Sequence, residues 1–94
     1  MQQDMVPIAL TLYTRAGCHL CEDMEAVLLP TAAEFGCVLE RVDISGDPAL
    51  EVRFGQEIPV LLVNGRKAFK YRLTERELRR RLQAERRERA GAAG

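Results

Sequence analysis

The feature that most constrains the fold of this chain is an abrupt change of hydrophobic period at the tetrad 18–21, which reads Cys-His-Leu-Cys. Before the tetrad, residues 8–14 alternate apolar and polar and are rich in strand-forming side chains, which predicts a β-strand. From residue 20 to residue 35 the apolar residues recur at helical spacing, which predicts an amphipathic helix packed on a sheet. Both cysteines therefore lie where a strand gives way to the start of a helix.

A Cys-x-x-Cys pair in this position has the chemistry of a thiol–disulfide redox motif. The thiolate is the reactive species, and the start of a helix stabilises negative charge through its unpaired N–H groups and its dipole. Because Cys18 and Cys21 occupy neighbouring positions of the first turn, one thiol can attack a substrate disulfide and the other can resolve the mixed disulfide.

His19, between the cysteines, has two interpretations that the sequence leaves open. A partly protonated imidazole, with an ordinary pKa near ~6.5, would stabilise a neighbouring thiolate. Alternatively, His19 is an exposed residue at the helix start with no role. Glu22, Asp23 and Glu25 favour the helix dipole but oppose a nearby thiolate, so the sequence does not give the sign of the thiol pKa shift.

Length and composition predict a single domain over residues 1–94, with a core at about 8–83. The apolar stripe stops after Leu82, so we expect residues 84–94 to fray. No apolar run is long enough to cross a bilayer, and the N-terminus lacks the basic and apolar parts of a secretory signal. Three cysteines make an odd count, which is unusual for a disulfide-stapled secreted protein. We therefore expect a cytoplasmic monomer with no membrane partner.

The net charge is zero, but the charges are unevenly distributed along the chain. Three basic and ten acidic residues precede Arg66, whereas eleven basic and four acidic residues follow from that position onward. Such asymmetry can indicate a nucleic-acid surface. No aromatic residues interleave the basic positions, so we interpret the segment as a solvated, arginine-rich helix and expect no nucleic-acid partner.

Local signals predict the remaining elements. Strands are expected over 38–44, 60–63 and 66–72, the last two joined by an Asn-Gly hairpin turn. A short helix is expected from Pro48 to Phe54 with Asp47 as its N-cap, and a last helix begins at a capping box formed by Thr74 and Glu77. Pro30 should kink or break the first helix.

The predicted order is β-α-β-α-β-β-α. The first β-α-β unit is expected to be parallel and right-handed, and the last two strands form a hairpin. The fold class predicted is therefore α/β, with a four-stranded mixed sheet flanked by three helices.

This order, the segment Tyr-Thr-Arg before the cysteines and the sequence Ile-Pro-Val at residues 58–60 together resemble the thioredoxin superfamily. The chain is most similar to its small glutaredoxin-like branch over residues 8–82. The resemblance implies that Cys18 is the exposed nucleophile and Cys21 the resolving thiol. It also implies that Pro59 is a cis proline that faces the cysteines and shapes the substrate groove.

Two further site residues follow from the resemblance. Arg15 matches a basic position that helps hold glutathione in glutaredoxins. The backbone of Ile58 would pair with an extended thiol substrate, as a strand adds to a sheet edge. The implied activity is a thiol–disulfide oxidoreductase that reduces protein or small-molecule disulfides, with no bound organic cofactor, glutathione as a candidate co-substrate and an external thiol reductant.

The chain also departs from glutaredoxins. His and Leu stand between its cysteines in place of Pro-Tyr, and it lacks the Gly-Gly pair and the Asp that hold the γ-glutamyl end of glutathione. A non-catalytic binding or adaptor module is therefore an alternative function. Metal or iron–sulfur cluster handling is another alternative. A zinc site needs four ligands in total, and only Cys37 and His19 remain to complete one with the two cysteines of the pair. Cys37 is expected to be a small buried hydrophobe and not a ligand.

Overall fold

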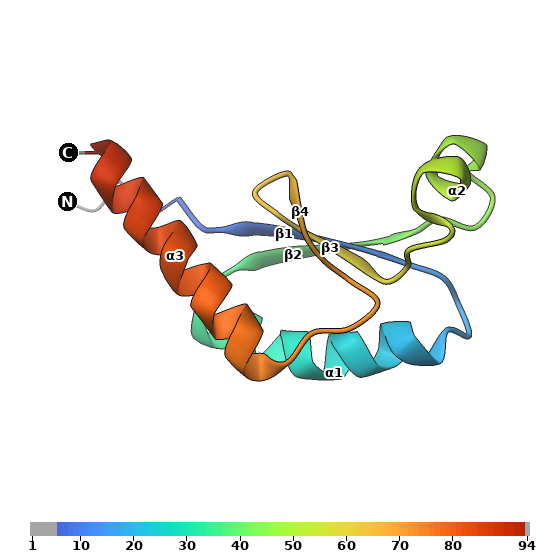
Figure 1. Ribbon diagram of the computed structural model, residues 1–94, viewed down its shortest axis with the longest axis horizontal. Coiled ribbons are helices and arrows are strands. Elements are labelled where there is room, and N and C mark those ends of the chain that lie inside the picture. The colour runs from blue at the N-terminus through green and yellow to red at the C-terminus, as the bar shows by residue number, and fades with distance from the viewer. Residues whose placement is uncertain (1–5, 94) are drawn as a thin grey trace.

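The computed structural model describes residues 6–93 and has the predicted order of elements (Figure 1). The elements are β1 (Ala9–Thr14), α1 (His19–Glu34), β2 (Val38–Asp43), α2 (Pro48–Phe54), β3 (Val60–Val63), β4 (Arg66–Lys70) and α3 (Glu75–Ala93). The strands form one sheet in the order β2-β1-β3-β4. Strand β1 is parallel to β2, and β3 is antiparallel to both of its neighbours. The predicted mixed sheet with three helices is confirmed.

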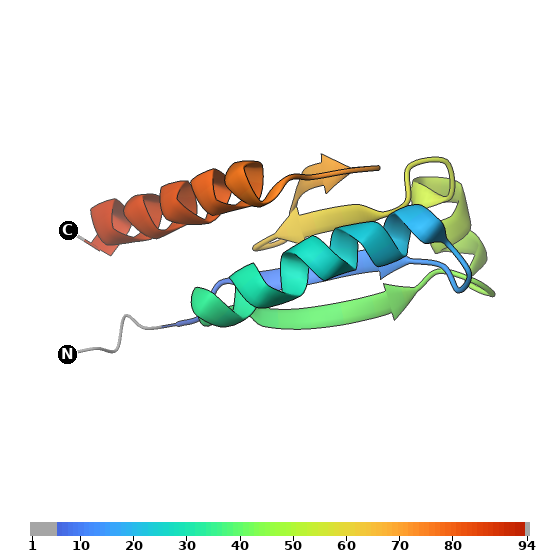
Figure 2. The ribbon, with the colours of Figure 1, turned by 90° about the horizontal axis from the view of Figure 1, so that it is seen from below.

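The two faces of the sheet pack against different helices. Helices α1 and α3 share the main core with alternate residues of β1 and β3, whereas α2 lies on the opposite face (Figures 1 and 2). Side chains alternate across a strand, so β3 contributes Leu61 and Val63 to the main core and Val60 and Leu62 to the smaller one. This two-sided burial explains why β3 reads as a continuous apolar run.

A kink or a break was predicted at Pro30, and the break is wrong, because helix α1 runs unbroken through this residue. Pro30 removes one backbone hydrogen bond, to the carbonyl of Ala26. Both residues lie on the exposed side of α1, where water can satisfy the freed carbonyl. The helix ends at Glu34, followed by Gly36 with φ of 67°, as the sequence predicts.

Helix α3 continues to Ala93, well beyond Leu82, so the helix includes residues 84–93 of the segment expected to fray, and Gly94 lies outside the described residues. Polar contacts take over where the apolar stripe stops. Glu85 is buried and accepts a hydrogen bond from Asn64, and Arg86 Nη2 donates to the carbonyl of Phe35 over 2.8 Å. These contacts anchor the second half of the helix to the sheet and to the end of α1.

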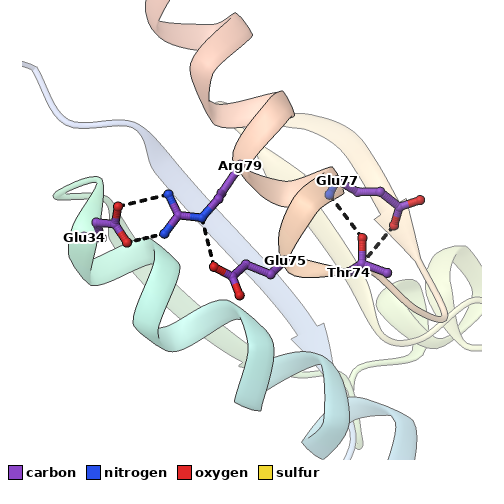
Figure 3. A network of polar contacts seen from close by, with 5 residues as sticks. All are labelled: Glu34, Thr74, Glu75, Glu77 and Arg79. Carbon is purple, nitrogen blue, oxygen red and sulfur yellow. Dashed lines mark hydrogen bonds and ion pairs between the residues drawn. The ribbon is translucent and has the colours of Figure 1, made fainter.

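The start of α3 is held by local and long-range polar contacts (Figure 3). The predicted capping box is present: Thr74 N donates to Glu77 Oε1 over 3.0 Å, and Glu77 N donates to Thr74 Oγ1 over 3.1 Å. Arg79 forms an ion pair with Glu75 on its own helix and a bidentate pair with Glu34 at the end of α1. This arginine therefore ties the two helices that cover the main core.

None of the helices in the described part of the chain combines the length and the apolar character that crossing a membrane requires.

Candidate active site

The pairing of β1 with β3 brings two distant segments to the same end of the sheet. Tyr13 lies opposite Val60 in the antiparallel register, so the loop that follows Thr14 and the Ile58-Pro59 segment that precedes β3 meet at one end of the sheet. Helix α1 begins at this end as well (Figure 1). The fold thus gathers the residues that the sequence singled out, although they are about forty positions apart in the chain.

The two cysteines form the first turn of α1. Cys18 is the N-cap residue, with extended backbone, and its Sγ accepts a hydrogen bond of 3.1 Å from the backbone N–H of Cys21. A sulfur atom thus takes the capping position usually occupied by a Ser, Thr, Asp or Asn oxygen. Both thiols are free, Cys18 is half-buried and Cys21 is buried. The backbone N–H of Cys21 thus holds the Cys18 sulfur at the N-terminus of α1.

Cys21 differs from Cys18 in its surroundings. Burial raises the pKa of the Cys21 thiol, and its hydrogen bond with the Cys18 side chain acts in the same direction. The hydroxyl of Thr14 and the backbone of Arg15 partly oppose this rise. The arrangement therefore has one accessible sulfur and one shielded sulfur that is protonated at neutral pH.

His19, between the cysteines, and Arg15, three residues before Cys18, face different partners. The His19 side chain is 96% exposed, and its nearest charged group is Glu22, with 3.8 Å between Nδ1 and Oε1. Arg15 forms an ion pair of 2.5 Å with Glu51 of α2. The residue expected to hold an anionic co-substrate is therefore already paired within the protein.

The Ile58-Pro59 peptide bond is cis, which confirms the prediction. Pro59 is buried and Ile58 is half-buried. Among the described residues, the backbone N–H and C=O of Ile58 have no hydrogen-bond partner. A backbone segment with unpaired N–H and C=O groups can form hydrogen bonds with an extended peptide.

A cleft of about 550 Å³ adjoins this end of the sheet. Leu20 and Asp23 of α1 line one side, and residues 71–74 line the other. Neither cysteine lines the cleft, although Leu20, between them in sequence, does.

Nothing in the sequence indicated the contacts that three residues make around the site. Glu51 pairs with Arg15, Thr14 acts on the Cys21 thiol, and Tyr71 lines the cleft. Glu51 and Thr14 are ordinary helix and strand residues, and only tertiary packing reveals their contacts. Tyr71 was expected inside the fourth strand, but β4 ends at Lys70 and Tyr71 has φ of 68°, so that assignment is wrong.

Cys37 lies apart from the site, after the far end of α1, and is half-buried against the main core. Burial raises the pKa of its thiol, and the charge of Arg86 partly opposes that rise. Within residues 6–93, no three side chains of His, Cys, Asp or Glu converge in the manner of a metal site.

Curated relatives and solved structures are similar to most of this chain. An uncharacterized protein from Mycobacterium bovis is 33% identical over 73 residues, which cover 72% of this chain and 75% of the relative. An uncharacterized protein from Mycobacterium tuberculosis matches with the same identity and coverage. Neither name states an activity.

Among solved structures, an X-ray structure of a structural genomics target from X. campestris has a TM-score of 0.70 at 36% identity, covering 80% of this chain and 96% of that one. A solution NMR structure of a protein from Nitrosomonas europaea has a TM-score of 0.69 at 30% identity, covering 83% and 94%. A mutant thioredoxin from Halobacterium salinarum has a TM-score of 0.63 at 18% identity, covering 82% and 73%, and shares the fold.

The family model named Glutaredoxin-like domain (DUF836) matches residues 9–83, which includes both cysteines and all four strands. The chain therefore belongs to this glutaredoxin-like family and has the thioredoxin fold.

Proposed function

We propose that the protein is a thiol–disulfide oxidoreductase that reduces disulfides by two-cysteine exchange. The observation that carries the proposal is the hydrogen bond from the backbone N–H of Cys21 to Cys18 Sγ at the start of α1. It supports a reactive thiolate at Cys18, while burial supports a protonated reserve thiol at Cys21. Family membership and fold supply only a prior, because a fold does not determine a function.

The exchange proceeds in two steps. The Cys18 thiolate attacks one sulfur of the substrate disulfide, which forms a mixed disulfide and releases the other substrate sulfur as a thiolate. Cys21 then loses its proton to solvent, and its thiolate attacks Cys18 Sγ and releases the second substrate thiolate. The protein is oxidised to the Cys18–Cys21 disulfide, and the substrate gains both electrons. An external thiol reductant regenerates the dithiol.

The expected substrate is a disulfide on a protein or a small molecule, and the proposed enzyme works as a cytoplasmic monomer without a bound cofactor. Glutathione is a weak co-substrate in this proposal. Arg15 is paired with Glu51, and the capping box occupies the N–H of Thr74 at the start of α3. Both groups would otherwise be available to a carboxylate. An adaptor that keeps the fold without turnover is the competing function.

Mass spectrometry of single variants tests the proposal. Incubated with a disulfide-linked peptide, the reduced wild-type protein should accumulate an internal disulfide between Cys18 and Cys21. The Cys21→Ser variant should instead accumulate a mixed disulfide on Cys18, because no thiol remains to resolve it.

The Cys37→Ser variant is the matched control and should behave as the wild type does. A wild-type protein that leaves the peptide disulfide intact, or a mixed disulfide that maps to Cys37, would contradict the proposed enzyme. The first of these results would favour the adaptor.

A further inference from the structure

Tyr71 has a backbone conformation that side-chain-bearing residues rarely adopt. Its φ is 68°, and Arg72 N donates to the carbonyl of Lys70 over 2.7 Å, so Tyr71 is the central residue of a tight turn with positive φ. Turns of this kind are rare and strained. Glycine is the residue that adopts such a conformation without steric cost, and a bulky aromatic residue here is an outlier with a cause.

The cause is a pair of hydrogen bonds from Tyr71 to the segment that precedes β3. The Tyr71 N–H donates to the carbonyl of Pro59 over 2.9 Å, and the Tyr71 hydroxyl donates to the carbonyl of Gln56 over 3.0 Å. One residue therefore holds both ends of the segment 56–59. Ile58 lies between the two anchor points.

Ile58 itself is left available by this arrangement. Its N–H and C=O have no hydrogen-bond partner in the described part of the chain, although the carbonyls of Gln56 and Pro59 on either side are both taken by Tyr71. The strained turn thus fixes the segment without occupying the groups that a substrate backbone would use.

We propose that Tyr71 is a positioning residue that holds the Ile58 backbone for pairing with an extended peptide, so that the enzyme favours peptide disulfides over small ones. This inference rests on the proposed oxidoreductase function. A peptide gains hydrogen bonds along the Ile58 edge, whereas a small disulfide without a peptide backbone gains none. The hydroxyl of Tyr71 should therefore affect the first substrate and not the second.

The Tyr71→Phe variant tests the proposal, because it keeps the ring and the backbone but removes the hydroxyl that reaches Gln56. The two substrates are a blocked alanine-serine peptide with one central cysteine in disulfide linkage to cysteamine, and hydroxyethyl disulfide. We expect KM for the peptide to rise about three- to tenfold, the change that corresponds to one neutral hydrogen bond. kcat for the peptide and kcat/KM for hydroxyethyl disulfide should stay within about twofold of the wild type.

Tyr13→Phe is the matched control, since the Tyr13 ring stacks on Phe54 at 4.3 Å between centroids and lies in the other core. This control variant should leave the kinetic constants for both substrates unchanged. An unchanged peptide KM in Tyr71→Phe, or an equal loss with both substrates, would overturn the proposal, because the second result indicates only a structural role.

A binding measurement separates this inference from the activity. An all-reduced Cys18→Ser protein is titrated with the blocked peptide, its cysteine in the thiol form, and the Ile58 amide is followed by NMR. The shift of that amide gives the Kd of the peptide. A Kd that rises about three- to tenfold when the Tyr71→Phe substitution is added supports the positioning role, whatever the turnover. Wild-type protein without turnover would refute the oxidoreductase alone, and an Ile58 amide that does not respond to the peptide would refute the role of Tyr71.

Discussion

Asn64, in the turn between β3 and β4, donates a hydrogen bond of 2.8 Å from Nδ2 to Glu85 Oε2 of α3. The same asparagine binds β1 on its other side, because its N–H donates to the carbonyl of Ala9 and its Oδ1 accepts from the N–H of Ala9. Glu85 is only 7% exposed, and the hydrogen bond from Asn64 is the main cause of its lowered pKa. Asn64 thus connects the hairpin turn to the start of β1 and to the last helix.

Removal of this buried carboxylate should destabilise the protein. We expect Glu85→Ala to lower the free energy of unfolding by about 1–3 kcal/mol, because it leaves the Asn64 amide without its partner. Chemical denaturation monitored by circular dichroism measures the change. Glu88→Ala, on the exposed side of the same helix, is the control and should alter stability by less than about 0.5 kcal/mol. Equal effects of both variants would show that the Asn64–Glu85 contact does not stabilise the fold.

The contribution of Glu85 should depend on pH. Its pKa is lower in the folded state than the ordinary value of 4.5, so the ionised carboxylate adds stability that is present above pH 4.5. That stability is lost as the pH falls through the folded-state pKa. Denaturation of the wild type and of Glu85→Gln should therefore differ most near neutral pH, and the difference should shrink below pH 4.5. A difference that stays constant down to pH 3 would contradict this linkage.

Release of Arg15 from its ion pair should improve the use of glutathione. We expect Glu51→Gln to lower KM for a glutathione mixed disulfide about two- to fivefold, because the freed guanidinium can bind a carboxylate, and a half-exposed ion pair is worth no more than about 1 kcal/mol. Steady-state kinetics measure this change, with Glu40→Gln as an exposed control that removes the same charge. Identical KM values for the two variants would mean that the Arg15–Glu51 pair does not limit glutathione binding.

The three thiols should differ in their rates of alkylation. Cys18 is the N-cap of α1, whereas burial raises the pKa of both Cys21 and Cys37. We expect iodoacetamide to modify Cys18 faster than either by on the order of tenfold at neutral pH. Brief exposure followed by peptide mass mapping gives the order, and preferential labelling of Cys37 would contradict the assignment of Cys18 as the nucleophile.

Features that depend on residues close together in the chain could be predicted from the sequence. The continuous apolar run 60–63 predicted β3, Asp47 and Pro48 predicted the start of α2, and Thr74 with Glu77 predicted the start of α3. Each of these signals involves neighbours within one helical turn or one strand, where periodicity and capping chemistry act directly. The cysteine pair at the start of α1 belongs to the same class.

Features that depend on distant contacts were decided by the tertiary structure. The resemblance assigned Arg15 to a co-substrate, and only the fold reveals that this arginine pairs with Glu51, 36 positions away. The sequence also placed Tyr71 in a strand, whereas a hydrogen bond to Gln56 holds it in a strained turn. The apolar stripe ends at Leu82, but a hydrogen bond from Asn64 holds α3 beyond that point. A long side chain pairs with the groups that the fold brings close to it. A hydrogen bond between distant segments can offset the local conformational preference of a residue. The sequence determined the order of the elements and the place of the two cysteines, and packing determined what surrounds them.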